Sequence, residues 1–265
     1  MDLAVRNRAY WTERAPSYTV DVETNIAHGG REMWRSALAN HLPEGDCLRI
    51  LDIGTGPGFF AILLTEMGHR VTAADYTPAM LEEARRNAGA LAEKIEFRQM
   101  DAQALEFPDN TFDVVVSRNL TWNLPDPERA YSEWFRVLKP GGRMINFDAD
   151  WYGYLFDDKK RVAVAQDRDN VRQEGCTDYN AYEKADEMEQ ISLLLPMGRV
   201  NRPDWDIQTL LRCGYRRIYT DTEVWKLPGD NEVKATFAPT PGFMICADKG
   251  GKDPAVLSPT APPFL

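Results

Sequence analysis

Three glycines at alternate positions, Gly54, Gly56 and Gly58, follow an apolar run that ends in Asp52. A second apolar run, Val71 to Ala74, ends in Asp75. This order predicts a buried parallel strand, a tight turn, a helix and a second buried strand. Glycine suits such a turn because it accepts positive φ and has no Cβ to hold a ligand away from the backbone. The pattern therefore predicts a nucleotide-binding βαβ unit.

The spacing of the glycines separates two classes of nucleotide site. A dinucleotide site of the G-x-G-x-x-G type needs a third glycine at the position where this chain has Phe59. The acid that closes the second strand, Asp75, stands where a carboxylate would hold the ribose hydroxyls. The pattern D-x-G-x-G-x-G over 52–58 instead resembles motif I of the class I S-adenosylmethionine (SAM)-dependent methyltransferases.

Helix and strand patterns alternate along most of the chain. Repeated strand–helix units favour a parallel, doubly wound sheet. We expect strands at 48–53, 70–75, 95–98, 112–117 and 143–148, helices at 30–42, 58–67, 78–87, 127–138 and 203–213, and a closing antiparallel pair at 215–227 and 243–247.

The segment 151–200 departs from this alternation. It opens on an aromatic group, continues as a charged and mainly helical stretch, and is too long for an ordinary connection. Near the N-terminus, Pro16 is expected to break a helix. The predicted organisation is an N-terminal helical lid (1–45), a SAM-binding α/β core (46–150), a helical cap insertion on the substrate side (151–200), the end of the core sheet (201–249) and a disordered tail (250–265).

Composition excludes several classes of protein. The 265 residues carry 41 acidic against 31 basic side chains, a net charge of −10, which disfavours nucleic-acid binding because that needs a basic face. The four cysteines have no metal-ligand spacing, so we expect free thiols and no metal. Charges run through the first 18 residues, unlike a secretory signal, and the longest apolar run is too short to span a bilayer. We therefore expect a cytoplasmic protein without membrane insertion.

Four blocks in order carry the family resemblance: 51–58, 74–81, 100–108 and 112–142, the last ending in Lys-Pro-Gly-Gly. Over 48–149 the chain is similar to the class I SAM-dependent methyltransferases of small-molecule type, in particular the ubiquinone/menaquinone-biosynthesis group. The resemblance implies an α/β fold with a doubly wound, mostly parallel seven-stranded Rossmann-like sheet and the cap after its fifth strand. It also implies methyl transfer from SAM to a small-molecule acceptor by in-line displacement, releasing S-adenosylhomocysteine (SAH).

The resemblance also implies which residues bind the cofactor. A carboxylate suits the ribose because it accepts from both hydroxyls. The implied set is Asp52, Gly54, Thr55 and Gly56 at the methionine part, Asp75 at the ribose, Tyr76 and Met80 beside adenine, Asp101 and Ala102 at the adenine edge, Ser117, Asn119 and Leu120 on the methyl side, and Tyr10 and Tyr18 from the lid.

The acceptor side is less determined by the sequence. Trp122, Trp151 and Tyr152 offer flat apolar area with polar edges, which suits an aromatic or partly apolar acceptor. A general base is needed only if the nucleophile is protonated, and no motif requires one. The candidates are Tyr18, His28 and Asp150, and no catalytic residue is assigned.

Three alternatives remain at this stage. A nicotinamide-dependent oxidoreductase would share the sheet and the ribose acid, but the glycine spacing and the Lys-Pro-Gly-Gly block disfavour it. A non-catalytic SAM-binding or adaptor protein would keep the fold and the pocket. A methyltransferase acting on a protein or RNA is the third alternative, and the acidic chain makes RNA the weaker of these substrates. The acceptor atom and the oligomeric state stay open.

Overall fold

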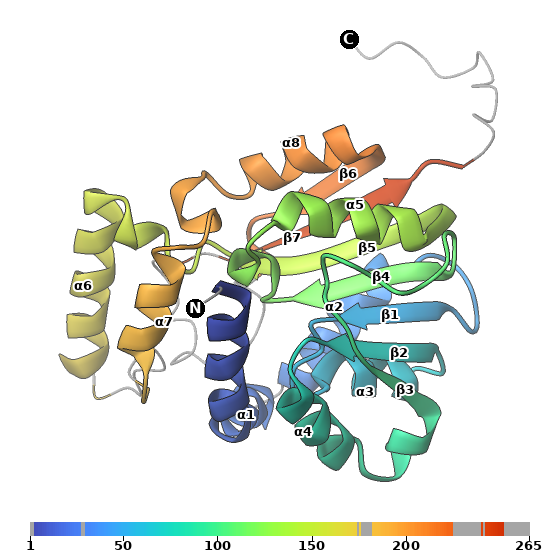
Figure 1. Cartoon of the computed structure of the whole chain (residues 1–265), viewed down its shortest axis with the longest axis horizontal. Coiled ribbons are helices and arrows are strands. Elements are labelled where there is room, and N and C mark those ends of the chain that lie inside the picture. Colours follow the sequence, from blue (N-terminus) through green and yellow to red (C-terminus); the bar gives the residue numbers. More distant parts are fainter. Residues whose placement is uncertain are drawn as a thin grey trace.

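A computed structural model describes residues 3–27, 30–173, 175, 182–224, 240 and 242–251. Its centre is a seven-stranded sheet in the order β3-β2-β1-β4-β5-β7-β6, flanked by helices on both faces (Figure 1). The strands are β1 (Arg49–Ile53), β2 (Arg70–Asp75), β3 (Ile95–Gln99), β4 (Phe112–Arg118), β5 (Leu138–Ala149), β6 (Tyr215–Asp221) and β7 (Gly242–Lys249).

The strand directions confirm the predicted sheet. Strands β1 to β5 pair in parallel, whereas β7 runs antiparallel to both β5 and β6. The strand order reverses between β1 and β4, because the chain builds outward to β3 and then crosses back. In open α/β sheets the crevice at such a reversal, beyond the carboxyl ends of the strands, is where ligands bind.

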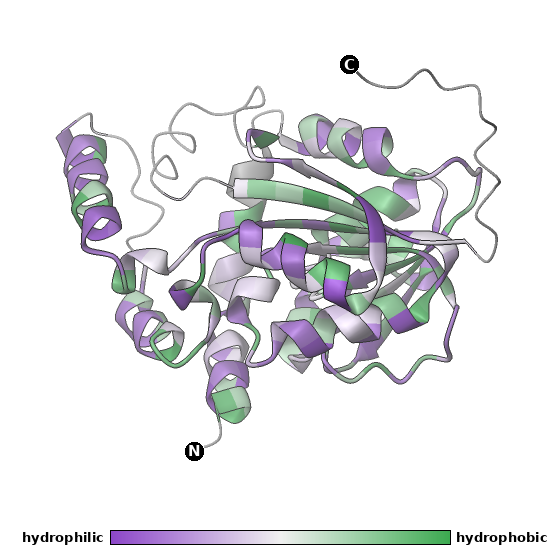
Figure 2. Cartoon of the chain, turned by 90° about the horizontal axis from the view of Figure 1, so that it is seen from above, coloured by the Kyte–Doolittle hydropathy of each residue, from purple (hydrophilic) through white to green (hydrophobic). Residues whose placement is uncertain are grey.

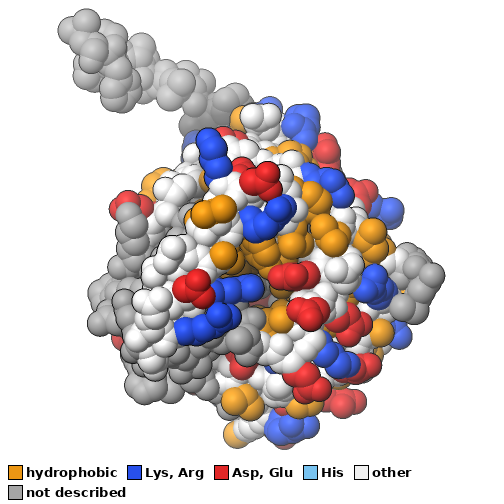
Figure 3. All heavy atoms as spheres, turned by 90° about the vertical axis from the view of Figure 1, so that its left-hand side faces the viewer, with side chains coloured by type: hydrophobic (Ala, Val, Ile, Leu, Met, Phe, Trp, Pro, Cys, Tyr) orange, Lys and Arg blue, Asp and Glu red, His pale blue; other side chains and the backbone are white. Residues whose placement is uncertain are grey.

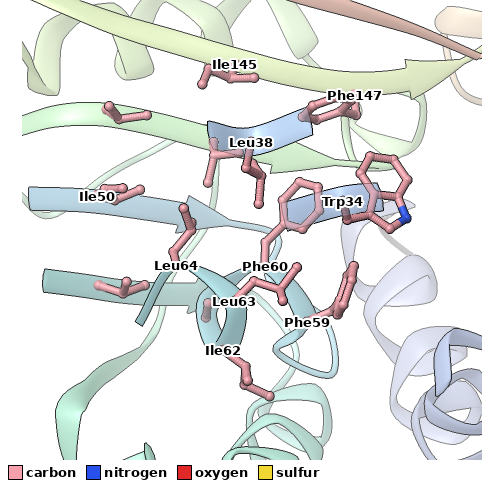
Figure 4. Close-up of a cluster of buried hydrophobic side chains, with 14 of the residues drawn as sticks. Trp34, Leu38, Ile50, Phe59, Phe60, Ile62, Leu63, Leu64, Ile145 and Phe147 are labelled. Atoms are coloured by element: carbon pink, nitrogen blue, oxygen red, sulfur yellow. The ribbon is translucent and has the colours of Figure 1, made fainter. Parts of the chain in front are cut away.

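Alternating side chains along the strands build a core on each face. On one face, helices α2 (Gly30–His41) and α3 (Phe59–Glu66) cover Ile50 and Phe147. The ring of Trp34 meets the rings of Phe60 and Phe147 edge-on, with centroids 5.4 and 5.1 Å apart (Figure 4). Edge-to-face packing of this kind adds to the stabilisation from buried apolar area.

On the opposite face, helices α5 (Pro127–Val137) and α8 (Asp204–Cys213) cover Leu51 and Met144. Figure 2 shows apolar segments concentrated in the sheet between polar outer surfaces. Three further helices lie between the strands: α4 (Pro78–Ala88), η1 (Gly89–Lys94) and η2 (Thr121–Asn123).

Two expectations about the core need correction. The fifth strand begins at Leu138, five residues earlier than expected, so the Lys-Pro-Gly-Gly block lies inside β5. The pairing register with β4 shifts between Phe112 and Val114, which accommodates the extra residues of this block. The strand expected over 215–227 ends at Asp221, and residues 225–227 lie outside the described ranges, as does the tail beyond 251.

The prediction that Pro16 would break a helix is wrong. Helix α1 (Leu3–Ala27) runs through Pro16 without interruption. A proline inside a helix costs about 3 kcal/mol because it lacks an N–H and crowds the preceding turn. Here Arg14 spans the site by donating to Ser17 Oγ at 2.5 Å and pairing with Asp21, and α1 packs against α2, α4 and α7. Tertiary packing therefore outweighs the local cost.

The segment after β5 is helical, as expected. It consists of η3 (Gly153–Leu155), α6 (Asp158–Gln173), α7 (Ala185–Ser192) and η4 (Met197–Arg199). Helices α6, α7 and α1 lie together at one side of the sheet, beyond the carboxyl ends of the parallel strands (Figure 1). On this side, apolar side chains gather between patches of both charges (Figure 3). No helix in the described ranges is long and apolar enough to cross a membrane.

A buried ion network around Arg202 joins four elements of the core. Arg202 donates to Asp206 Oδ2 at 2.9 Å and to Asp148 Oδ2 at 3.1 Å, and all three side chains are fully buried. Its third nitrogen donates to Thr121 Oγ1 at 2.7 Å, and Tyr131 donates to Asp206 at 2.7 Å. One guanidinium thus connects the end of β5, η2, α5 and α8.

Replacing Arg202 by Met should strongly destabilise the protein, because it leaves two buried carboxylates without their cation. We expect a loss of about 3–5 kcal/mol in the free energy of unfolding, measured by urea denaturation. The control is Arg212→Met, which removes an ion pair with Glu128 whose side chains are each 51% exposed, and should cost less than about 1 kcal/mol. Equal losses in the two variants would contradict this role for Arg202.

Candidate functional site

A pocket of about 1010 Å³, counted with its open mouth, lies at the carboxyl ends of the parallel strands. The loops after β1, β2, β3 and β4 supply one side and α1 supplies the other. Its lining residues are Ala4, Asn7, Arg8, Trp11, Tyr18, Asp52, Gly54, Thr55, Gly56, Pro57, Phe59, Phe60, Asp75, Tyr76, Thr77, Met80, Asp101, Ala102, Gln103, Arg118, Asn119, Leu120, Asn123, Leu124 and Pro125.

The glycine turn after β1 needs its glycines for two reasons. Gly54, Gly56 and Gly58 all have positive φ, at 68°, 52° and 88°. A Cβ on Gly54 would come within 2.7 Å of Leu120, and one on Gly58 within 2.9 Å of the Cβ of Ala84. The turn is therefore both left-handed and closely packed, and it leaves backbone atoms at the pocket surface.

Asp75 ties this turn to the end of β2. Its Oδ2 accepts from the Gly56 N–H at 3.0 Å and its Oδ1 from the Thr77 N–H at 2.8 Å. Desolvation outweighs these bonds and raises the pKa of Asp75 to about 6. Each oxygen of the Asp75 carboxylate keeps a further lone pair, so the two oxygens can accept hydrogen bonds from two ligand hydroxyls.

Asp52 lies deeper in the pocket. It is 2% exposed, and its Oδ2 accepts from Thr55 Oγ1 at 2.6 Å. Burial raises the pKa of Asp52 to about 7, against the opposing effect of Thr55 and of the Arg118 charge. A carboxyl group with a pKa of about 7 is partly protonated at neutral pH, and a ligand cation beside it would stabilise its ionised form.

Arg118, which the sequence reasoning missed, faces the same end of the pocket. Its guanidinium carbon lies 5.5 Å from the ring centroids of Trp34 and Phe59 and 5.7 Å from that of Phe60. No carboxylate of the described residues forms an ion pair with it. With Asp52 nearby, this end of the pocket offers one negative and one positive group, which suits a ligand carrying both an ammonium and a carboxylate. The sequence contained one indication of a role for Arg118, which is its position directly after the fourth apolar run.

The opposite end of the pocket is built from the loops after β2 and β3. Asp101 Oδ1 accepts from the backbone N–H and side-chain nitrogen of Gln103 at 2.8 and 3.0 Å. Met80 is 3% exposed, whereas Tyr76 is 37% exposed and lies 5.3 Å from the guanidinium of Arg8. A flat apolar side with polar atoms at its edge suits a heteroaromatic ring.

One face of α1 closes the pocket. Residues 4, 7, 8, 11 and 18 recur at helical spacing and all line it. Trp11 Nε1 donates to Asn123 Oδ1 at 2.8 Å, which joins α1 to η2. Trp11 was expected in the lid, whereas Ala4, Asn7 and Arg8 were missed, because Pro16 obscured a helical spacing that the sequence does contain. Asn123 was missed as well, because it lies in η2 and carries no motif.

Several sequence-predicted residues lie away from this pocket. Tyr10, 2% exposed, points from the other side of α1 into a cluster with Trp122 and Met188. Ser117 is fully buried within β4. His28 lies outside the described residues. The structure brings together the other predicted cofactor residues: Tyr18, Asp52, Gly54, Thr55, Gly56, Asp75, Tyr76, Met80, Asp101, Ala102, Asn119 and Leu120.

The residues expected at the acceptor line a second, smaller pocket of about 220 Å³. Trp122, Trp151, Tyr152 and Asp150 all contribute to it. The rings of Trp122 and Tyr152 are 5.0 Å apart, and Asp150 is paired with Lys160 at 2.6 Å. These aromatic side chains do not line the main pocket: they pack in one cluster with side chains of α1 and α7.

Comparison with known proteins agrees with this geometry. A family model described as a methyltransferase domain matches residues 51–146. A demethylmenaquinone methyltransferase of Thermus thermophilus is 39% identical over 137 residues, 51% of this chain and 62% of the relative. A ubiquinone/menaquinone biosynthesis C-methyltransferase of Cereibacter sphaeroides is 35% identical over 169 residues, 57% of this chain and 68% of the relative. For the first three relatives the matched share of their length is 62, 55 and 49%.

Solved structures share the fold at low identity. Phosphoethanolamine N-methyltransferase 2 of Haemonchus contortus, in complex with SAM, matches with a TM-score of 0.54 at 18% identity, over 82% of this chain and 52% of that one. The [4+2]-cyclase SpnF matches with a TM-score of 0.53 at 16% identity, over 82% and 80%. The fold alone therefore does not determine the reaction. The match to about two thirds of the Cereibacter enzyme at 35% identity, together with the family model over the strands that carry the pocket, shows that this chain belongs to the class I SAM-dependent methyltransferase family.

Proposed function

We propose that this protein moves a methyl group from SAM to a small-molecule acceptor by in-line displacement and releases SAH. The observation that carries the proposal is the main pocket, where the glycine turn, Asp75 and the Asp52–Arg118 end meet on one surface. When bound there, SAM supplies a methyl group on a positively charged sulfur.

The residues present fit SAM along its whole length. The ionised form of Asp52 would meet the ammonium of the methionine part, and Arg118 its carboxylate. Asp75 would accept from the two ribose hydroxyls, and Tyr76 and Met80 would flank adenine, with Asp101 at its edge. This arrangement would give the ammonium, the carboxylate, the ribose hydroxyls and the adenine edge each a partner of matching charge or hydrogen-bonding capacity.

The protein has two tasks in such a transfer, since the leaving group is already activated. It must align the acceptor with the S–CH3 bond and exclude water from the site. We infer that α1 does both as the lid, because Trp11 and Tyr18 line the pocket and Tyr18 lies 3.8 Å from the position of a Cβ on Gly56. Residues 1–45 as lid, 46–150 as SAM core and 151–200 as cap remain our proposed division.

A small molecule is the acceptor class best supported. The matched relatives are named as methyltransferases of menaquinone and ubiquinone biosynthesis. The net charge of −10 speaks against RNA. Cys47, Cys213 and Cys246 are free thiols, which suits our proposal of a cytoplasmic location.

Labelled SAM separates these alternatives directly. Incubating the protein with methyl-labelled SAM and a metabolite extract should place the label in the small-molecule fraction. Label recovered in added protein or RNA instead would contradict the acceptor class. SAM binding without any transfer would favour a binding or adaptor protein.

Replacing Asp75 by Ala should weaken SAM binding by roughly 1.5–3 kcal/mol, because two charge-assisted hydrogen bonds to the ribose are lost. Isothermal titration calorimetry measures the affinity. The control is Asp109→Ala, which removes a carboxylate that is 66% exposed and lies outside the pocket. Unchanged affinity in a folded Asp75→Ala variant would overturn the ribose assignment.

SAM affinity should rise with pH between about 5.5 and 7.5. The pKa values of Asp75 and Asp52 are raised to about 6 and about 7, so the ligand-free protein keeps these protons below neutral pH. In the unfolded chain an Asp side chain ionises near pH 4. Between about pH 4 and the raised pKa values of Asp75 and Asp52, the contribution of these two acids to the free energy of unfolding therefore falls as pH rises. The SAM ammonium favours ionised Asp52, and binding below pH 7 must expel its proton.

Calorimetry across this pH range tests the argument. The Asp52→Asn variant should bind SAM less tightly than the wild-type protein. Its SAM affinity should also stop rising with pH above about 6.5, because position 52 no longer carries a proton that SAM binding must expel. A wild-type affinity that is constant from pH 5.5 to 7.5 would contradict the proposed role of Asp52.

A further inference from the structure

The side chain of Gln103 joins two segments that line the main pocket. Gln103 lies two residues after Asp101 in the loop that follows β3. Its Nε2 donates to Asp101 Oδ1 at 3.0 Å, and its Oε1 accepts from the backbone N–H of Asp126 at 2.7 Å. The two residues before Asp126, Leu124 and Pro125, line the pocket as well. One amide group therefore bridges the loop after β3 and the segment after η2.

The chemistry of its partners fixes the orientation of the Gln103 amide. A backbone N–H can only donate, so the atom that meets the N–H of Asp126 must be the amide oxygen. The nitrogen at the other end then faces the Asp101 carboxylate, which accepts. A flipped amide would set two donors against each other at Asp126 and two acceptors against each other at Asp101, so only one orientation satisfies both contacts.

The bonds from Gln103 make the two oxygens of Asp101 unlike. Oδ1 accepts from the backbone N–H of Gln103 at 2.8 Å and from its side-chain nitrogen at 3.0 Å. Oδ2 accepts no hydrogen bond from the residues that the structure describes. Since Asp101 lines the pocket, Oδ2 is the oxygen with full acceptor capacity for a ligand.

The backbone of this loop is held independently of the Gln103 side chain. The Met100 N–H donates to Asp75 O at 2.9 Å, and Ala102 O accepts from Trp134 Nε1 at 3.1 Å. A substitution at position 103 therefore removes the two side-chain bonds while these anchors of the loop remain. Its main effect falls on the orientation of the Asp101 carboxylate.

We propose that Gln103 is a positioning residue that makes the pocket selective for adenine over a base with a carbonyl group in place of the exocyclic amine. This inference rests on the proposed function, in which Asp101 lies at the adenine edge. The amine of adenine donates, and Asp101 Oδ2 accepts. A carbonyl oxygen at that place would face the carboxylate as a second acceptor. Because Gln103 holds Oδ1, Asp101 cannot turn away from the wrong base without losing the bonds at Oδ1.

Two ligands that differ only in the base test the inference. SAH carries adenine, and S-inosylhomocysteine carries hypoxanthine, which has a carbonyl group where adenine has its amine. Isothermal titration calorimetry measures both affinities. We expect the wild-type protein to bind SAH about a hundredfold more tightly than S-inosylhomocysteine.

Two substitutions at position 103 separate the two side-chain bonds. Gln103→Glu keeps an oxygen for the Asp126 N–H but loses the donor to Asp101, whereas Gln103→Met loses both bonds. The preference for SAH should fall about tenfold in each variant, because each leaves Asp101 Oδ1 without its side-chain donor. The matched control is Gln166→Met, which changes an exposed glutamine of α6 outside the pocket and should keep the full preference.

The ratio of the two affinities separates positioning from a merely structural role. A loosened loop would weaken both ligands equally, whereas a turned Asp101 carboxylate weakens SAH more than S-inosylhomocysteine. Thermal unfolding of each variant with and without SAH shows that the protein is folded and binds the cofactor product.

The outcomes distinguish two failures. If the wild-type protein binds neither SAM nor SAH, the proposed function fails. If it binds SAH but has no preference over S-inosylhomocysteine, or if Gln103→Met and Gln103→Glu keep the wild-type preference, the role of Gln103 is wrong while the proposed function stands. A preference lost in Gln103→Met but kept in Gln103→Glu would also overturn it, because the contact with Asp126 would then carry the selectivity.

Discussion

The pocket depends on a short set of hydrogen bonds between β2 and the glycine turn after β1. The Gly54 and Thr55 N–H groups donate to Ala74 O at 2.8 and 3.0 Å, and the Gly56 N–H donates to Asp75 Oδ2 at 3.0 Å. These bonds hold a left-handed turn against a parallel strand, so backbone and carboxylate face the same space. This arrangement removes Asp52 and Asp75 from water, which raises their pKa values. The protonation of both side chains therefore responds to the charge of a ligand.

The parts of this site that the sequence predicted are those encoded by neighbouring residues. Apolar runs of strand length, closed by an acid or a glycine turn, specify β1 and β2 and the position of Asp75, because buried parallel strands need continuous apolar sequence. The helix at 204–213 was similarly predictable, since Gly214 ends it in the left-handed conformation.

The parts that were not predictable depend on contacts between distant residues. Pro16 disfavours a helix locally, yet α1 is continuous because it packs on α2, α4 and α7. The aromatic group at 151–156 has the composition of a ligand wall, but whether such rings face a ligand or one another is decided by α1 and α7. Arg118 carries no motif, and only the fold brings it beside three aromatic rings and Asp52.

That α1 forms a pocket wall has a consequence for how this protein can change its substrate. A helix keeps its backbone when its exposed side chains are replaced, whereas a loop generally rearranges. The pocket-lining positions 4, 7, 8 and 11 alternate with Tyr10 and Ala15, which anchor the same helix in buried surroundings. The apolar anchors thus lie on a different face of this helix from the pocket wall, where Asn7 and Trp11 alone also bond to Asn123 among the described contacts. Substitutions at positions 4 and 8 can therefore reshape this wall while the cofactor side, carried by the strand loops, remains as it is.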